Sequence, residues 1–100
     1  MAKLTNNMIA ISSTAILSEI IAMGLKQGLD LPLQLKVYDA GTASSWLVKH
    51  WDEFTRLRRS PAFVEIMNKD IRLGLELAQE SGIKMPIISM CSEYDFYVRE

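Results

Sequence analysis

The sequence predicts an all-α domain of about five helices, with a long helix at its N-terminus. Apolar residues recur at helical spacing over residues 3–27 and again over residues 61–81, and no proline interrupts the interior of either stretch. No segment shows the alternating pattern of a strand, and the sequence contains no Asn-Gly or Gly-Asn hairpin turn. We also find no internal repeat and no linker, so residues 1–100 are expected to form one domain.

The first predicted helix covers residues 3–27 and has two different faces. Its apolar positions are Leu4, Met8, Ile11, Ala15, Ile16, Leu17, Ile20 and Ile21. A second stripe is polar or small and consists of Lys3, Asn7, Ala10, Thr14 and Ser18. We therefore expect both faces to be at least partly buried, with Gly28 as the stop.

Capping residues mark the ends of the later helices. The second begins after Asp30 with Pro32 in its first turn and ends at Gly41. The third begins after Ser44 or Ser45 and is broken by "RRSP" at residues 58–61. The fourth has Ser60 as its cap and Pro61 at its first position, and it stops at Gly82. A fifth helix starts at about Pro86.

One carboxylate interrupts the apolar seam predicted for the fourth helix. The seam, at spacings of three and four, is Phe63, Ile66, Asp70, Leu73 and Leu77. A buried carboxylate is costly without a partner, so we expect an inward lysine or a bound polar ligand beside Asp70. Lys69 lies about 100° around the helix, on the polar face.

Composition and charge exclude several classes. The chain is 49% hydrophobic and 23% charged, which is an ordinary globular balance. The net charge of −1 gives no electrostatic case for nucleic acid or an anionic membrane, and "RLRR" at residues 56–59 is best interpreted as a solvated loop or helix end. The single cysteine, Cys91, excludes an intramolecular disulfide and favours a reducing compartment. No uninterrupted apolar run reaches the roughly 20 residues of a membrane span, so a cytoplasmic protein is expected.

The stretch "KLTNN" is the best candidate for chemistry. Lys3, Asn6 and Asn7 fall on one side of a helix and offer one ammonium and two amides. Such a set suits a small substrate with a carboxylate and a hydroxyl, since the lysine can exchange the hydroxyl proton. The alternative is a solvated helix start with a capping asparagine, which spacing alone favours.

The other polar candidates are weaker. Lys69 either pairs with Glu65 on an exposed face or reaches a cofactor phosphate or ribose. His50, the only histidine, is predicted to be a packing or surface residue. One histidine and one cysteine support neither a zinc site nor a Cys–His nucleophile, and the sequence contains no GxGxxG motif and no P-loop.

Taken in order, "KLTNN", "GTASSW" and "NKDIRLGLELAQESGIKMP" resemble the C-terminal helical domain of the β-hydroxyacid dehydrogenases. That family includes 3-hydroxyisobutyrate dehydrogenase, tartronate semialdehyde reductase and 6-phosphogluconate dehydrogenase. The resemblance covers about residues 3–95 and implies a bundle like the C-terminal domain of 6-phosphogluconate dehydrogenase. It also implies an NAD(P)-dependent oxidoreductase that transfers a hydride to or from a small hydroxyacid.

The resemblance assigns roles to individual residues. Lys3 matches the family's catalytic general acid/base, and Asn7, with Asn6 beside it, matches the substrate-binding asparagine. Lys69 matches the lysine that contacts the nicotinamide cofactor. Asp70 follows it as in the family, and the resemblance places both residues at the cofactor-binding site. Phe63 resembles an aromatic residue near the family's active site, but its spacing to "KD" is slightly short, so we do not assign it a role.

The departures from the family shape the remaining expectations. The family's N-terminal Rossmann domain is absent from this sequence, so we expect no NAD or NADP bound to this chain alone and no turnover by it. The chain is then a substrate and dimerisation domain of a larger enzyme, expected to form a homodimer. The alternative is a non-enzymatic helical interaction module derived from that fold. No metal, nucleic acid or membrane partner is expected.

Overall fold

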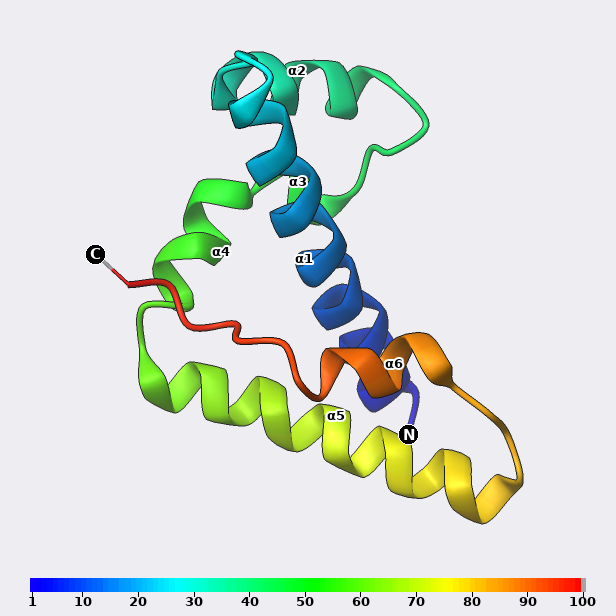
Figure 1. Ribbon diagram of the computed structural model, residues 1–100. Helices are drawn as coiled ribbons and strands as arrows, with labels where there is room; N and C mark the ends of the chain where they lie inside the picture. Colours follow the sequence, from blue (N-terminus) through cyan, green and yellow to red (C-terminus); the bar gives the residue numbers. More distant parts are fainter. Residues whose placement is uncertain (100) are drawn as a thin grey trace.

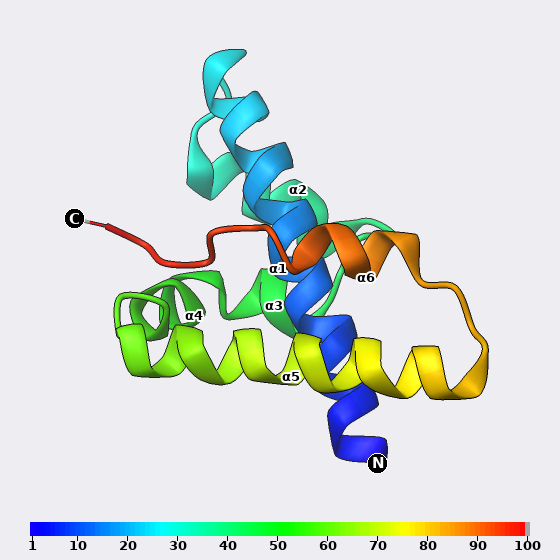
Figure 2. The ribbon, with the colours of Figure 1, turned by 60° about the horizontal axis from the view of Figure 1, so that its bottom comes forward.

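The computed structural model describes residues 1–99, and the helices in this part of the chain confirm the predicted all-α class. They are α1 (Ala2–Lys26), α2 (Leu31–Ala40), α3 (Trp46–Lys49), α4 (Trp51–Leu57), α5 (Pro61–Ser81) and α6 (Pro86–Cys91). No strand occurs within these 99 residues. Figure 1 shows α2 at the far end of α1 from the N-terminus, with α5 and α6 near the other end. The helix α1 crosses α5 near the middle of α5 (Figure 2).

Helix α1 is the centre of the domain, because α2, α3, α5 and α6 all contact it. Its apolar face buries Met8, Ile11, Ala15 and Ile21, as predicted. The small polar stripe is exposed at Lys3 and covered, at least in part, from Asn7 to Ser18. Thr14 is fully buried, and its hydroxyl donates a hydrogen bond of 2.8 Å to the carbonyl oxygen of residue 10. The prediction of two buried faces is therefore confirmed for this helix.

Two isoleucines of α1 lie on a different side from the one predicted. Ile16 and Ile20 were expected to point inward, but 54% and 40% of their surfaces are exposed. They follow Ala15 and precede Ile21 by one residue, which places them about 100° from the covered face. An apolar run in the sequence therefore continues around α1 beyond the part that its neighbours cover.

The buried face of α5 also lies one residue away from the predicted seam. Its buried residues are Val64, Met67, Ile71, Gly74 and Ala78, whereas Ile66 of the predicted seam is 57% exposed. The glycine explains the choice of face, because a Cβ atom at position 74 would overlap the thioether of Met8. On this face the Met8 side chain of α1 packs directly against the backbone of α5 at Gly74. The predicted ends of α5 are confirmed: the Ser60 hydroxyl accepts from the backbone N–H of Phe63, and Gly82 caps the helix at φ 71°.

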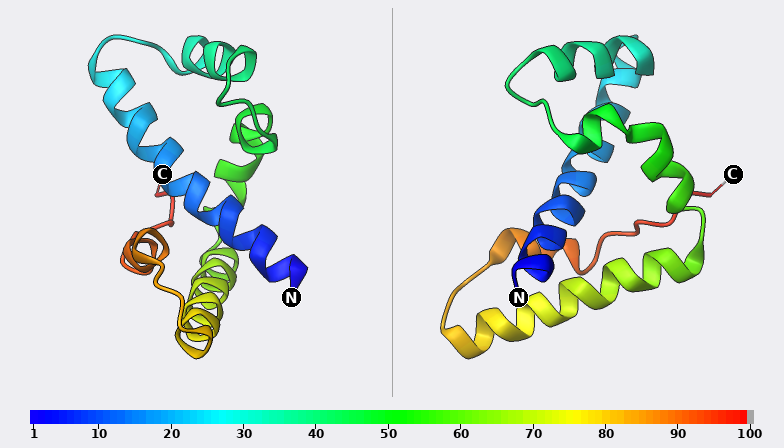
Figure 3. Two further views of the ribbon diagram at one scale, coloured as in Figure 1. Left: turned by 90° about the vertical axis from the view of Figure 1, so that its right-hand side faces the viewer. Right: turned by 180° about the vertical axis from the view of Figure 1, so that it is seen from behind.

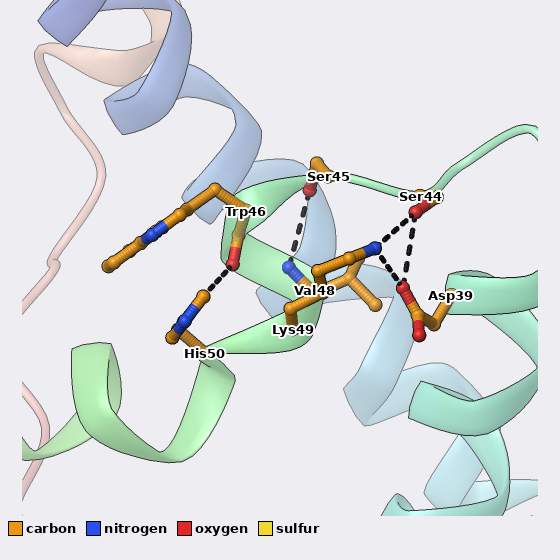
Figure 4. Close-up of polar contacts among 7 residues, drawn as sticks. All are labelled: Asp39, Ser44, Ser45, Trp46, Val48, Lys49 and His50. Carbon is orange, nitrogen blue, oxygen red and sulfur yellow. Dashed lines mark hydrogen bonds and ion pairs between the residues drawn. The ribbon is translucent and has the colours of Figure 1, made fainter.

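The third predicted helix is divided in two at His50. The backbone of His50 leaves the helical region, with φ −121° and ψ 28°. Its imidazole stacks on the Trp46 ring at 4.2 Å, and Nδ1 lies 2.9 Å from the Trp46 carbonyl oxygen (Figure 4). The His50 side chain thus interacts with a carbonyl oxygen of α3, and the chain changes direction before α4 begins. The prediction that His50 is a packing or surface residue agrees with this position.

A polar cluster joins the end of α2 and the loop after it to α3. The Lys49 ammonium donates to Asp39 at 2.5 Å and to the Ser44 hydroxyl at 2.9 Å (Figure 4). Ser45 is the N-cap of α3, since its hydroxyl accepts from the backbone N–H of Val48. Of the two serines proposed as the cap, Ser45 fills this role. The hydrogen bond from Lys49 is the main cause of the lowered pKa of Asp39.

The residues after α6 return along α5 toward the end of α4 (Figures 1 and 3). Arg58 holds them there, because its Nε–H donates to the Phe96 carbonyl oxygen at 2.8 Å, and its own carbonyl accepts from the backbone N–H of Val98. Phe96 is completely buried. Arg58 is only 4% exposed, so the interpretation of "RLRR" as fully solvated is wrong at this residue. Its aliphatic stem and head serve as a structural clamp for the C-terminal segment.

By length and composition, the helix α1 could cross a membrane, with a window of mean hydropathy 1.8. This differs from the expectation drawn from uninterrupted apolar runs, because a helix tolerates the serines and threonines that interrupt this run. A single such helix is weak evidence for a membrane span. The buried central helix of a globular domain passes the same test, and 39% of this window is buried inside the domain.

Candidate functional site

A small cavity lies where α1 crosses α5, and α4 closes one of its sides. Its volume is about 200 Å³. The lining is apolar except for one amide and one carboxylate; it consists of Asn7, Ala10, Ile11, Phe54, Phe63, Ile66, Met67 and Asp70. An apolar concavity with a few convergent polar groups is the usual form of a small-molecule site.

The two polar residues of the cavity are bonded to each other. The Asn7 amide nitrogen donates to a carboxylate oxygen of Asp70 at 3.1 Å, and both side chains are partly buried. The partner expected for Asp70 was a lysine or a bound ligand, whereas the observed partner is this asparagine. The reason is that α1 presents its polar stripe, rather than its apolar face, to this part of α5.

The structure separates the other predicted site residues. Lys3 is exposed and stands one helical turn before Asn7, on the same side of α1. Lys69 is exposed on the outer side of α5, next to Asp70 in sequence but not in the cavity. The predicted cluster thus becomes a bonded pair, Asn7 and Asp70, with one lysine a turn away and another outside.

Asn6 belongs to a different hollow. This shallow depression lies on another side of α1, between that helix and the start of α3. It is lined by Asn6, Ile9, Ala10, Ser13, Ser45, Trp46 and Leu47. Consecutive residues of a helix point about 100° apart, which explains why the two asparagines face different spaces.

Sequence reasoning missed most of the aromatic wall. Phe63, left without a role, lines the cavity and meets Phe54 edge to face, with ring centroids 5.6 Å apart. Phe54 was not considered at all. Its position depends on the change of direction at His50, and no spacing signal in the sequence reports that bend.

The cavity suits a small neutral or monoanionic group better than a phosphate. A carboxylate in its wall disfavours a dianion, and the remaining lining offers one amide and no cation. The nicotinamide carboxamide of NAD(P), or a short hydroxyacid, matches an amide set among apolar side chains. The lining therefore suits a carboxamide better than a pyrophosphate. Among residues 1–99, no group of three or more His, Cys, Asp or Glu side chains could hold a metal ion.

Comparison with known families gives one match. A family model described as "NAD-binding of NADP-dependent 3-hydroxyisobutyrate dehydrogenase" matches residues 1–95. The description refers to nucleotide binding, so it does not support the expected assignment of these residues to a C-terminal substrate and dimerisation domain. Comparisons with curated proteins and with solved structures found no match.

Proposed function

Because the chain belongs to the family of NADP-dependent 3-hydroxyisobutyrate dehydrogenase, we propose that it forms the helical side of an NAD(P)-dependent dehydrogenase site for a small β-hydroxyacid. The observation that carries the proposal is the Asn7–Asp70 pair in an apolar cavity, one helical turn from Lys3. A volume of about 200 Å³ admits a molecule of a few carbons and excludes a large sugar phosphate.

Each residue then has a part in the reaction. NAD(P), when bound, supplies the hydride acceptor or donor. Lys3 exchanges the proton of the substrate hydroxyl, since its flexible ammonium can reach over one turn of helix toward Asn7. Asn7 holds the substrate oxygen through its amide, and the aromatic wall of Phe54 and Phe63 excludes water from the reacting carbon.

Lys69, the second of the two lysines among the predicted site residues, is proposed to bind the cofactor from outside the cavity. It projects from the exposed side of α5 next to Asp70, where a nucleotide-binding domain could approach. An ammonium there could bind a phosphate or ribose oxygen that the cavity itself does not accommodate. In this arrangement the reacting groups lie in the cavity, and the phosphates of the dinucleotide lie at the edge of the cavity near Lys69.

The experiment that tests the proposal replaces Lys3 in the dehydrogenase that contains this chain. Lys3→Ala should lower kcat by roughly 10²–10⁴-fold, the usual contribution of a general acid/base. Lys26→Ala is the matched control, since it removes an exposed lysine from the last turn of the same helix. A kcat for Lys3→Ala close to that of the control would refute the role.

An exposed apolar surface supports a second candidate, a non-enzymatic dimerisation module. Ile16 and Met23 of α1 and Ile87 and Met90 of α6 are each more than half exposed. A homodimer that covers them is compatible with either function, and analytical ultracentrifugation at tens of micromolar tests it. Turnover that depends on Lys3 would decide for the enzyme, whereas a dimer with no nucleotide or hydroxyacid binding would decide for the module.

A further inference from the structure

We propose that Asp70 is a positioning residue that determines which end of the Asn7 amide faces the substrate. The inference rests on the proposed function for its consequence in catalysis, but its geometric part stands on the structure alone. The hydrogen bond of 3.1 Å joins α1 to α5 across 63 residues of sequence. It is the only contact between polar side chains in the lining of the cavity.

The chemistry of the two groups makes the orientation unambiguous. An ionised carboxylate can only accept hydrogen bonds, whereas an amide has a donating nitrogen and an accepting oxygen at opposite corners. Asp70 must therefore face the Asn7 nitrogen. The amide oxygen is left free, and it can accept a hydrogen bond from the hydroxyl of a bound hydroxyacid, whose proton Lys3 then removes.

The same carboxylate orients the substrate as a whole. Asp70 forms no ion pair with any of residues 1–99, so its charge is not neutralised by a neighbouring lysine or arginine. A substrate carboxylate placed beside it would be repelled. The acidic group of the hydroxyacid should therefore point away from Asp70.

A role limited to joining two helices would not need an aspartate. Asparagine at position 70 has nearly the same shape and could still accept a hydrogen bond, but it could equally donate one to the oxygen of Asn7. The substitution Asp70→Asn thus keeps a possible hydrogen bond between α1 and α5. It removes the acceptor-only carboxylate that fixes the orientation of the Asn7 amide. This difference separates positioning from simple cross-linking.

The first test uses the chain itself and no activity. Solvent exchange of the Asn7 side-chain amide protons is followed by nuclear magnetic resonance in wild type, Asp70→Ala and the control Glu76→Ala, which alters an exposed carboxylate of the same helix. Loss of a hydrogen bond to a charged group should speed exchange by about tenfold in Asp70→Ala and not in the control. Equal exchange rates in all three proteins would overturn the proposal.

The second test uses the dehydrogenase that contains this chain, with 3-hydroxyisobutyrate and NADP. In Asp70→Asn, kcat/KM for the hydroxyacid should fall by about tenfold or more, with KM for NADP unchanged. The exchanged pair Asn7→Asp with Asp70→Asn restores the link between the helices but turns a carboxylate toward the substrate. Its melting temperature should be close to that of the wild type, and its activity should stay low.

Two results would overturn the positioning role. If the exchanged pair recovered both melting temperature and activity, Asp70 would only join the helices. If Asp70→Asn raised KM for NADP instead, Asp70 would bind the cofactor directly. An absence of turnover in the wild-type protein would be a failure of the proposed function, and the exchange measurement would still decide whether Asp70 holds Asn7.

Discussion

The packing of α2 against the end of α1 gives a prediction in which two effects of one substitution oppose each other. Gly24 is buried under the side chain of Gln34, which is itself only 2% exposed. The Gln34 amide nitrogen donates to the carbonyl oxygens of Ile21 at 3.2 Å and Leu29 at 3.0 Å, and its oxygen accepts from the Tyr38 hydroxyl at 2.9 Å. The bond to Ile21 joins α2 to α1, the bond to Leu29 reaches the loop between the two helices, and the bond from Tyr38 lies within α2.

The substitution Gly24→Ala should break this arrangement. A Cβ atom at position 24 would lie 2.5 Å from Cδ and 2.6 Å from Nε2 of Gln34, which is too close for either atom to stay in place. Losing three hydrogen bonds costs about 3 kcal/mol at roughly 1 kcal/mol each. Alanine returns about 1 kcal/mol as the better helix former. The net loss of unfolding free energy is therefore about 2 kcal/mol.

Thermal unfolding followed by circular dichroism measures the result. For a domain of this size, the melting temperature should fall by roughly 8–16 °C. The double variant Gly24→Ala with Gln34→Ala removes the side chain that clashes, so in a Gln34→Ala background the glycine substitution should become stabilising. A Gly24→Ala protein at least as stable as wild type would refute the reasoning.

Two further predictions concern Cys91 at the end of α6 and Arg58, which holds the C-terminal segment. Burial, with a smaller contribution from the charge of Glu19, raises the pKa of the Cys91 thiol above its ordinary value of 9.0. Iodoacetamide should therefore modify Cys91 more slowly in the folded protein than in the urea-unfolded chain at pH 8. The raised pKa also contributes to the free energy of unfolding. This contribution is present in full below pH 9.0 and is lost as the pH rises through the raised pKa. Equal rates in both states would contradict this. Arg58→Met should lower the unfolding free energy by about 2–3 kcal/mol, because a buried carbonyl loses its charged donor. Chemical denaturation measures this loss, and the exposed Arg56→Met is the control that should change little; equal effects of the two would contradict the clamp.

Several elements could be predicted because their signals are local. The caps Asp30 and Ser60 and the stop at Gly82 act within a few residues, and the structure has them where the sequence places them. The break at His50 was not predictable in the same way. It depends on a ring that stacks on Trp46 and lies close to that residue's carbonyl oxygen, and nothing in helical periodicity describes this contact.

The buried face of α5 shows where periodicity fails. The predicted seam through Ile66 and Leu73 and the buried face through Gly74 have the same spacing and differ by one residue, so periodicity does not choose between them. On the buried face, Gly74 leaves the space that the thioether of Met8 from α1 occupies. For the candidate site, the spacing in "KLTNN" identified Asn7. Its hydrogen bond to Asp70 depends on how α1 crosses α5, and the sequence of neither helix alone predicts that crossing.

That crossing has a consequence for how the domain folds. The cavity has no precursor in any one helix, since the hydrogen bond across it closes a loop of 63 residues. Contacts of such long range form late and add to the entropic barrier, whereas α1 and α5 can each gain their own backbone hydrogen bonds early. Partial openings that undock α1 from α5 erase the cavity without melting either helix. The site should therefore be one of the last features to form on folding and one of the first to disappear on unfolding.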